Sequence, residues 1–307
     1  MKKAVILSII SLSLILTACN SNEESETTSV KNGKRIDDIH GVGVMDNGTT
    51  YFATHEGLFS TKDMGKTWNK VGASNDDFMG FHLRSDGTMI TSGHPGANSE
   101  FPNPLGILMS KDKGLNWKKV EYVGEIDFHL LTTAHDDQNI IYGLNQMGTG
   151  KYGAGIYKSI DGAKTWKKVE PKGLPDDLMK VYSLLPLPNN TLLAGTEKGV
   201  MITKDGGENW GIYDNRRLIT AMVVMPKSKD ILAYSISNGE SGILISQDAG
   251  QTWKRLGLDL GKDAASSISV NQKDEKQIAV STYSTSLYVT KDGGQNWNQI
   301  ITSGKLK

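Results

Sequence analysis

Short apolar runs, many with alternating polar and apolar positions, are separated by turn residues along most of the chain. Alternation with a period of two is typical of half-buried β-strands, and Asn-Gly or Asp-Gly between two such runs is a strong hairpin signal. Asn47-Gly48 and Asp86-Gly87 are two such turns. The first unit of this pattern therefore predicts four strands, at 39–45, 50–54, 58–61 and 68–71.

Later parts of the chain repeat this order of strands. The fourth unit predicts strands at 181–187, 191–195 and 200–203, and the sixth unit predicts strands at 267–270, 277–281, 287–290 and 297–301. No segment shows a convincing period of 3.6 residues, which an amphipathic helix would require. The pattern of apolar positions therefore predicts an all-β fold.

One motif, Ser/Thr-x-Asp-x-Gly-x-Thr/Asn-Trp, recurs six times between the third and fourth strands and contains all six tryptophans. Successive tryptophans are separated by 49, 49, 44, 43 and 44 residues. A period of about 40–50 residues is the length of one four-stranded propeller blade. We therefore predict a six-bladed β-propeller over residues 37–301, with seven blades as the alternative. The copies are TKDMGKTW at 61–68, SKDKGLNW at 110–117, SIDGAKTW at 159–166, TKDGGENW at 203–210, SQDAGQTW at 246–253 and TKDGGQNW at 290–297.

The aspartate of each copy is predicted to be structural. A short Asp side chain can accept backbone N–H groups across its own turn, and the glycine supplies a left-handed conformation. The tryptophan offers a large apolar surface that can pack between neighbouring blades. Ala163 replaces the glycine in the third copy, so that turn is expected to differ. The six aspartates are Asp63, Asp112, Asp161, Asp205, Asp248 and Asp292.

The charge balance argues against one class of partner. The chain has 34 Lys and Arg residues against 34 Asp and Glu residues, and we find no basic patch interleaved with aromatic residues. Binding to the phosphate backbone depends on such a basic surface. We therefore expect no nucleic-acid partner.

The N-terminus has the features of an export signal. Lys2 and Lys3 precede an apolar run at 4–16, which is shorter than the roughly 20 residues of a spanning helix. The sequence LTAC follows at 16–19, and Cys19 is the only cysteine. LTAC resembles the lipobox of bacterial lipoproteins, which implies cleavage before Cys19, its acylation, and attachment to the extracytoplasmic face of the cell membrane. A plain secretory signal with an incidental cysteine is the alternative.

The chain therefore divides into three parts. Residues 1–18 are expected to be a lipoprotein signal peptide. Residues 19–36, which are mostly polar and free of aromatic side chains, are expected to be a flexible lipid-anchored tether. Residues 37–301 form the predicted propeller, and the pattern leaves open how its ring closes.

The six motifs resemble Asp-box, or BNR, repeats, which occur in sialidases, xyloglucan-degrading glycosidases, sortilin-type receptors and a photosystem II assembly factor. About residues 37–301 also resemble small bacterial lipoproteins labelled glycosyl hydrolases or exo-sialidases. This resemblance implies a propeller and, by its label, a glycosidase. It is carried by IHGVG at 39–43, ATHEGL at 53–58, SGHPG at 92–96 and DFH at 127–129.

The resemblance also implies a ligand site on the face opposite the Asp boxes. Counting back six residues from each box reaches His55, Gly153, Glu197, Glu240 and Ser284, and counting forward from the second Asp-Gly hairpin adds His94. Four of these six equivalent rim positions are His or Glu. The predicted ligand-binding residues are therefore His55, His94, Glu197 and Glu240.

Four of the six histidines are expected at one mouth of the channel. With a two-residue loop at Asn47-Gly48, His40 would lie directly opposite His55, with Cβ atoms about 4.5–5.5 Å apart. Imidazole is the commonest side-chain metal ligand. The candidate divalent-metal ligands are His40, His55, His94 and His129. Rim histidines bonded to backbone are the alternative, and His82 and His135 are expected to be structural or solvated.

A glycosidase usually needs two carboxyl groups about 5–5.5 Å or 6.5–9.5 Å apart. The candidates on the proposed face are Glu56, Asp127, Glu197 and Glu240, with Glu125 beside them. The sialidase resemblance further implies three arginines around the substrate carboxylate and an Arg-Ile-Pro motif. This chain has five arginines, and Arg35-Ile36 is followed by Asp37, so the sialidase pattern is not matched.

Two classes of function follow from the sequence. The first is an extracytoplasmic, lipid-anchored propeller that binds a small molecule, glycan or protein at its axial mouth, with a metal-binding version that uses the four histidines. The second is a glycoside hydrolase. The sequence leaves open whether the protein is an enzyme.

Overall fold

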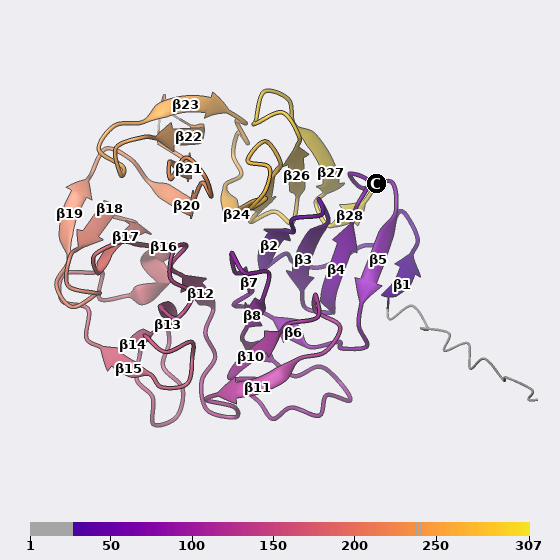
Figure 1. Ribbon diagram of the computed structural model, residues 1–307, viewed down its shortest axis with the longest axis horizontal. Helices are drawn as coiled ribbons and strands as arrows, with labels where there is room; N and C mark the ends of the chain where they lie inside the picture. Colours follow the sequence, from indigo (N-terminus) through magenta and orange to yellow (C-terminus); the bar gives the residue numbers. More distant parts are fainter. Residues whose placement is uncertain (1–26, 238, 240) are drawn as a thin grey trace, which may run out of the picture.

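The computed structural model describes residues 27–307 except residues 238 and 240. The predicted signal peptide and Cys19 lie outside the described residues. Across the described part, six sheets are arranged in a ring around a central axis, as Figure 1 shows. This confirms the prediction of a six-bladed β-propeller.

The first three blades cover the N-terminal half of the ring. Blade 1 contains β1 (Thr27–Val30), β2 (Gly41–Val44), β3 (Thr50–Thr54), β4 (Gly57–Thr61) and β5 (Trp68–Val71). Blade 2 contains β7 (His82–Leu83), β8 (Met89–Thr91), β10 (Ile107–Ser110) and β11 (Lys118–Glu121). Blade 3 contains β12 (Leu130–Thr133), β13 (Ile141–Asn145), β14 (Gly155–Ser159) and β15 (Lys167–Val169).

The last three blades complete the ring. Blade 4 follows a short 3₁₀ helix, η1 (Leu178–Lys180), and contains β16 (Val181–Leu187), β17 (Thr191–Thr196), β18 (Gly199–Thr203) and β19 (Gly211–Asp214). Blade 5 contains β20 (Ile219–Val224), β21 (Ile231–Ser235), β22 (Gly242–Ser246) and β23 (Lys254–Gly257). Blade 6 contains β24 (Ala265–Val270), β25 (Ile278–Thr282), β26 (Leu287–Thr290), β27 (Asn298–Thr302) and β28 (Lys305–Leu306).

A small extra sheet lies between the first two blades. It pairs β6 (Asp77–Phe78) with β9 (Gly93–His94) in antiparallel fashion, with Asp77 opposite His94 and Phe78 opposite Gly93. β6 also contacts β3 and β4 of blade 1. The extra sheet therefore ties the insertion in blade 2 to the blade 1 side of the ring.

The first hairpin differs from the prediction in its register. Gly41 pairs with Ala53, so the preceding position, His40, lies level with Thr54, and His55 lies one residue farther along, in the next turn. The cause is a three-residue loop: Met45 bonds to Thr49 O, and Gly48 takes the left-handed conformation with φ 82°. The prediction of a two-residue loop with His40 directly opposite His55 was therefore wrong.

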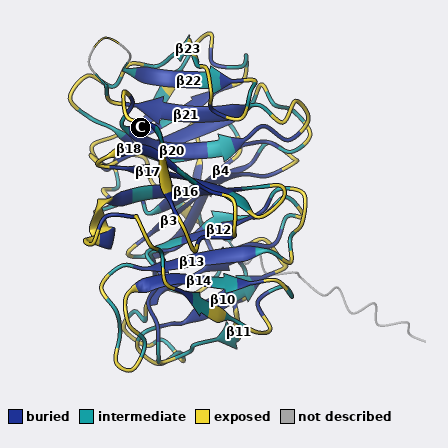
Figure 2. Cartoon of the chain, turned by 90° about the vertical axis from the view of Figure 1, so that its left-hand side faces the viewer, coloured by how far each residue is buried: buried dark blue, intermediate teal, exposed yellow. Residues whose placement is uncertain are grey.

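Apolar side chains fill the spaces between blades, and the exposed residues gather in the loops (Figure 2). Six buried clusters are found in the described residues, one for each pair of neighbouring blades. Each cluster contains one Asp-box tryptophan, either buried or packed against it: Trp68, Trp117, Trp166, Trp210, Trp253 and Trp297. Each tryptophan packs its own blade against the preceding blade.

The box aspartates accept hydrogen bonds within their own turns. In the third copy, Asp161 accepts from the Ser159 hydroxyl and from both the backbone N–H and the hydroxyl of Thr165. The Thr165 hydroxyl, together with these other donors, holds the pKa of Asp161 at about 2. The replacement at Ala163 is accommodated with φ 75°, a left-handed conformation that glycine adopts more easily.

The two ends of the chain meet where the ring closes. β1 adds a fifth strand to the outer edge of blade 1 by pairing with β5, and β28 extends blade 6 (Figure 1). Between them, Arg35 forms a bridge with Lys305, and Ile36 is buried in the cluster between blades 6 and 1. The folded unit therefore reaches from Thr27 to Leu306, beyond the predicted bounds of 37–301, and includes the second half of the predicted tether.

The described residues contain no helix of the length and apolar character that crossing a membrane requires.

Candidate functional site

A cavity of about 670 Å³ follows the axis of the ring. Its walls come from the first strand of each blade, including Val42 of β2, Leu131 of β12, Leu184 of β16 and Ile268 of β24. The strands that begin each blade therefore form the inner wall of the propeller.

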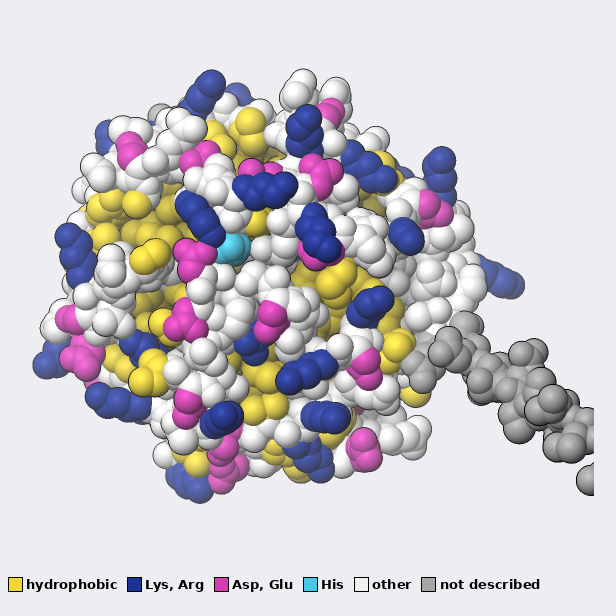
Figure 3. All heavy atoms as spheres, viewed as in Figure 1, with side chains coloured by type: hydrophobic (Ala, Val, Ile, Leu, Met, Phe, Trp, Pro, Cys, Tyr) yellow, Lys and Arg dark blue, Asp and Glu magenta, His cyan; other side chains and the backbone are white. Residues whose placement is uncertain are grey.

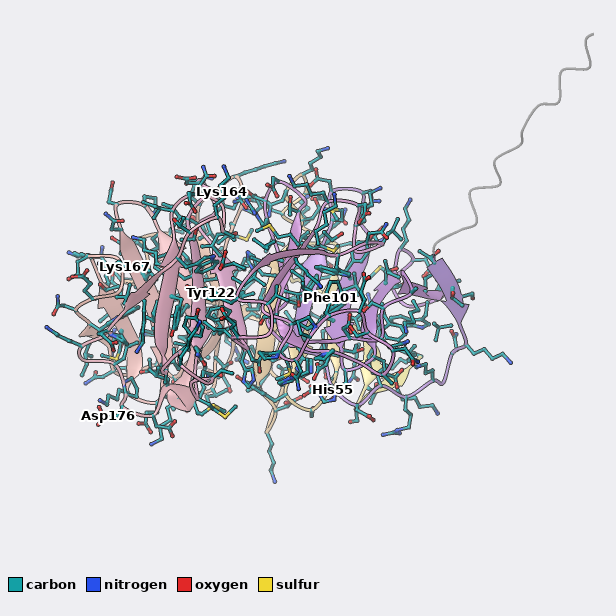
Figure 4. The ribbon with its side chains drawn as sticks, turned by 90° about the horizontal axis from the view of Figure 1, so that it is seen from below. His55, Phe101, Tyr122, Lys164, Lys167 and Asp176 are labelled. Atoms are coloured by element: carbon teal, nitrogen blue, oxygen red, sulfur yellow. The ribbon has the colours of Figure 1, made fainter. Side chains whose placement is uncertain are left out.

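The two ends of this cavity differ in their loops. The Asp-box turns all lie at one end, because each joins the third strand of a blade to the fourth. In Figure 4, Lys164 of the third box lies at one face and His55 lies at the opposite face. The predicted rim positions are therefore on the face opposite the boxes, and we call this end the mouth.

Polar side chains from several blades meet across the box end. His135, in the loop after β12, bonds through Nε2 to Gln272 of blade 6 at 3.0 Å and through Nδ1 to Lys229 of blade 5 at 3.1 Å. Ser85 of blade 2 donates to the His135 carbonyl. Figure 3 views this face and shows a histidine near its centre, ringed by charges of both signs. His135 thus has a structural role at the end opposite the mouth.

One donor group at the mouth comes from blade 1. Asp38, His40 and His55 offer ligand atoms within 4.8 Å of one another, and we call them the first donor group. The rings of His40 and His55 stack with centroids 4.6 Å apart. The side chain of His40 is only 10% exposed, whereas that of His55 is 46% exposed. Although the hairpin register differs from the prediction, the two histidines are in contact.

A second donor group comes from blades 2 and 3. His94, Asp127 and His129 offer ligand atoms within 4.8 Å of one another. Oδ2 of Asp127 lies 3.1 Å from Nε2 of His94 and 2.7 Å from Nε2 of His129. The hydrogen bond to Asp127 raises the pKa of His129, against the opposing effect of burial. The aspartate thus joins two histidines that lie 35 residues apart in the sequence.

Asp77 connects the two donor groups. Its Oδ1 lies 3.1 Å from Nε2 of His40, and its Oδ2 lies 4.0 Å from Nε2 of His55. Asp77 is also paired with His94 in the small sheet, and its charge helps to raise the pKa of His129. Asp77 therefore contacts the first group through its carboxylate and adjoins the second group through its backbone.

Three buried nitrogen and oxygen atoms of the His and Asp side chains at the mouth have no hydrogen-bond partner in the described structure. They are Nε2 of His40, Oδ1 of Asp77 and Oδ1 of Asp127. Nε2 of His40 and Oδ1 of Asp77 are 3.1 Å apart, but their angles are not those of a hydrogen bond. Buried polar atoms are nearly always partnered, because an unpartnered one costs roughly 1–3 kcal/mol. Lone pairs arranged in this way suit a cation.

The wall across the mouth from the histidines is apolar. Met179, Ile236 and Tyr283, from blades 4 to 6, line the cavity and are 49%, 39% and 57% exposed. Exposed large apolar side chains gathered around one cavity are unusual on a soluble surface. The mouth therefore combines a half rich in histidine and aspartate with an apolar half.

Two of the other predicted site residues are held in ion pairs with lysines. Glu56 forms an ion pair with Lys34 at 2.5 Å, and Glu197 forms one with Lys180 at 2.9 Å. Glu240 lies outside the described residues. Of the carboxylates predicted as catalytic candidates, the structure places Asp127 among the histidines.

The remaining histidine, His82, lies in β7 and lines the axial cavity. Its Nε2 lies 3.0 Å from the Thr133 hydroxyl. Burial, together with the nearby Arg84 charge, lowers the pKa of His82 to about 4. It is therefore neutral at physiological pH and has a structural role.

Sequence reasoning missed Asp38 and Asp77. Asp38 lies two residues before His40, which places both side chains on the same face of an extended chain. That spacing could have identified it. Asp77 lies in the connection between blades 1 and 2, where the repeat offers no position to count from, so the sequence holds no comparable signal.

Comparisons with known proteins agree with this architecture. The profile of the family described as photosynthesis system II assembly factor YCF48 matches residues 177–305. A sialidase of Bacteroides fragilis is 27% identical over 181 residues, covering 47% of this chain and 33% of the relative. The photosystem II assembly lipoprotein Ycf48 of a Synechococcus species is 27% identical over 124 residues, covering 38% of this chain and 34% of the relative. The match thus spans about a third of the length of these curated relatives.

Solved structures show the same fold at low sequence identity. The GH74 enzyme of Niastella koreensis superimposes with a TM-score of 0.60 at 15% identity, over 91% of this chain and 47% of that chain. YCF48 bound to a D1 peptide superimposes with a TM-score of 0.50 at 16% identity, over 90% of this chain and 86% of that chain. The repeat and the fold are those of a BNR-type propeller.

Proposed function

We propose that this protein is a lipid-anchored, extracytoplasmic β-propeller that binds a divalent transition metal at its histidine-rich mouth and, through that metal, a ligand in the axial cavity. The second donor group carries this proposal. Asp127 is more than nine-tenths buried, contacts two imidazoles, and keeps one oxygen without a hydrogen-bond partner.

The donor chemistry favours zinc or copper(II). Imidazole nitrogen and carboxylate oxygen together suit these ions, whereas magnesium and calcium prefer oxygen alone. Two ligands of a tetrahedral zinc ion, each about 2.0–2.1 Å from it, lie about 3.3 Å apart. The separation of Asp127 Oδ2 from His94 Nε2, 3.1 Å, is close to this value, and the metal would replace the 2.7 Å hydrogen bond between Asp127 and His129.

The cavity favours a ligand with two different ends. A carboxylate or similar oxygen donor would reach the metal, and an apolar body would lie against Met179, Ile236 and Tyr283. A peptide fits this description, and the structure of the relative YCF48 has been solved with a bound D1 peptide. The glycoside-hydrolase alternative needs two neighbouring carboxylates. Glu56 and Glu197 do not form such a pair, because each is held in an ion pair with a lysine.

Metal analysis tests the proposal directly. The full chain, purified in detergent and equilibrated with Zn²⁺ or Cu²⁺, should retain metal in stoichiometric amount after dialysis. Asp127→Asn should weaken the affinity of the second donor group by at least about 10- to 100-fold, since even ligand-orienting residues contribute that much. Competition with a chromogenic chelator gives the affinities.

His135→Ala is the matched control. It removes an imidazole whose exposure is similar to that of His129 but which lies at the opposite end of the cavity. The metal affinity should therefore be unchanged. Metal content near zero in the wild-type protein would contradict the proposal. So would an equal loss of affinity in Asp127→Asn and His135→Ala.

The membrane attachment rests on the N-terminal sequence, with Lys2 and Lys3, the apolar run at 4–16 and LTAC at 16–19. Two acyl chains give a stable anchor, because each buried methylene contributes about 0.8 kcal/mol. Expressed in a bacterium fed with a labelled fatty acid, the wild-type protein should carry the label and partition into the detergent phase. Cys19→Ser should lose the label. Label retained in Cys19→Ser would exclude this cysteine as the site.

A further inference from the structure

We infer that the mouth is a two-metal centre, with one cation on each donor group and Asp77 as the carboxylate shared between them. This inference rests on the metal binding proposed above and adds its stoichiometry, its bridging residue and its cofactor class, a pair of zinc or copper(II) ions. Asp77 is not among the residues that the sequence singles out.

The ligands are too many and too evenly divided for one ion. Four imidazoles and three carboxylates lie at the mouth, whereas zinc is held by about four ligands. They form two groups, each with two histidines and an aspartate. The first group is built from blade 1 and the second from blades 2 and 3, so each has its own support.

Asp77 has the position of a bridge. Its side chain reaches the first group, since Oδ1 lies 3.1 Å from Nε2 of His40 and Oδ2 lies 4.0 Å from Nε2 of His55. Its backbone neighbour across the small sheet is His94, and directly opposed residues of an antiparallel pair have Cβ atoms about 4.5–5.5 Å apart. Asp77 therefore contacts the stacked histidines of blade 1 through its carboxylate and lies beside His94, the first ligand of the second group, through its backbone.

The atoms without hydrogen-bond partners favour Asp77 over Asp38 as the carboxylate nearest the first cation. Asp38 approaches the Nδ1 edge of His40, at 3.9 Å, and already accepts a hydrogen bond from the backbone of Ile39. Asp77 approaches the Nε2 edge, at 3.1 Å, where both Nε2 and the facing Oδ1 are buried without a hydrogen bond. The first cation therefore binds on the Nε2 edge of His40, beside Asp77.

The net charge of the carboxylates at the mouth is compatible with two divalent cations. The ion pairs of Asp38, Asp77 and Asp127 are made with histidines, which become neutral when they bind a metal. Three carboxylates, two of them largely buried, then need compensating charge, since buried unpaired charges are costly. One divalent cation leaves the cluster with a net charge of −1 and two leave it with +1, so the charge balance permits a second ion.

Stoichiometry and spectroscopy of the detergent-purified full chain test the inference. The wild-type protein should bind two Cu²⁺ ions, and its EPR signal should be broadened by the neighbouring ion. The double variants His40→Ala/His55→Ala and His94→Ala/His129→Ala should each bind one ion and give a sharp spectrum. Asp77→Asn, which keeps the size of the side chain, should weaken one ion by at least tenfold and reduce the broadening.

Asp46→Asn is the matched control, because it changes a half-exposed carboxylate that pairs with Lys273 and belongs to neither donor group. It should keep two ions and the broadened spectrum. Thermal unfolding of each metal-free variant identifies any that fail to fold; the conservative variants His55→Gln and His94→Gln then replace the doubles.

The outcomes separate this inference from the proposed function. No bound metal in the wild-type protein overturns both. One bound ion, lost equally when either group is removed, overturns the two-metal centre and leaves metal binding standing. Two ions with unchanged affinity and spectrum in Asp77→Asn overturn the shared carboxylate.

Discussion

Replacing Phe128 with alanine is expected to lower the free energy of unfolding by about 3–5 kcal/mol and to weaken metal binding by the second donor group. Phe128 is fully buried between blades 2 and 3, where it stacks on Trp166 at 5.9 Å and meets Tyr157 edge-on at 5.6 Å. It lies between Asp127 and His129 in the sequence, so the same ring anchors the backbone that carries both proposed metal ligands.

The structure explains why this site cannot collapse around the loss. The ring lies against Gly143 of β13, where an added Cβ would be 2.7 Å from it, and the Phe128 N–H donates to the Ser92 hydroxyl. Denaturant unfolding measures the stability loss, and chelator competition measures the affinity. Phe128→Leu should lose less of both, and Tyr283→Ala, which removes an exposed aromatic ring, should barely change stability. A loss below about 1 kcal/mol in Phe128→Ala would contradict this account of the core.

Gly93→Ala is expected to reduce metal binding by at least tenfold while the ring of blades still folds. A Cβ at Gly93 would lie 2.0 Å from the Asp77 carbonyl oxygen, and the residue has φ 136°, which only glycine adopts easily. The substitution must therefore separate β6 from β9. Because these two strands carry Asp77 and His94, the two donor groups would move apart.

Gly211→Ala is the control for this change. Gly211 also lies in a strand, β19, but an added Cβ there meets nothing within 4 Å. Isothermal titration with Zn²⁺ compares the two variants, and circular dichroism shows whether each retains its strands. Wild-type affinity in Gly93→Ala would show that the small sheet does not position the metal ligands.

The fold could be predicted from the sequence because each blade is a local meander with a strong marker. The box fixes where the third strand ends and the fourth begins, so the strand at 68–71 and the strands at 181–187 and 287–290 agree with β5, β16 and β26 residue for residue. The closure of the ring was not predictable in this way. It depends on Arg35 and Lys305, which are distant in sequence and lie outside the repeat.

The candidate site was predictable only as far as the repeat extends. His55 was found by counting from its box and His94 by counting from the second Asp-Gly hairpin, and the structure places both at one mouth with His40 and His129. Glu197 occupies an equivalent position, but its neighbour Lys180 holds it in an ion pair. Asp77 was not predicted because it lies in an irregular connection between blades. Its position depends on the pairing of β6 with β9, for which the sequence has no local pattern.

The pairing of β1 with β5 sets how far this domain can stand from a lipid bilayer. Asp37, where the propeller was predicted to begin, follows Cys19 by 18 positions, whereas Thr27, where β1 begins, follows it by eight. At about 3.4 Å per residue, the maximum leash length falls from about 60 Å to about 27 Å. With Cys19 acylated as proposed, the protein would be attached through the outer edge of blade 1 and would stay close to the membrane surface. Its mouth would then meet partners embedded in that membrane far more often than molecules in the bulk.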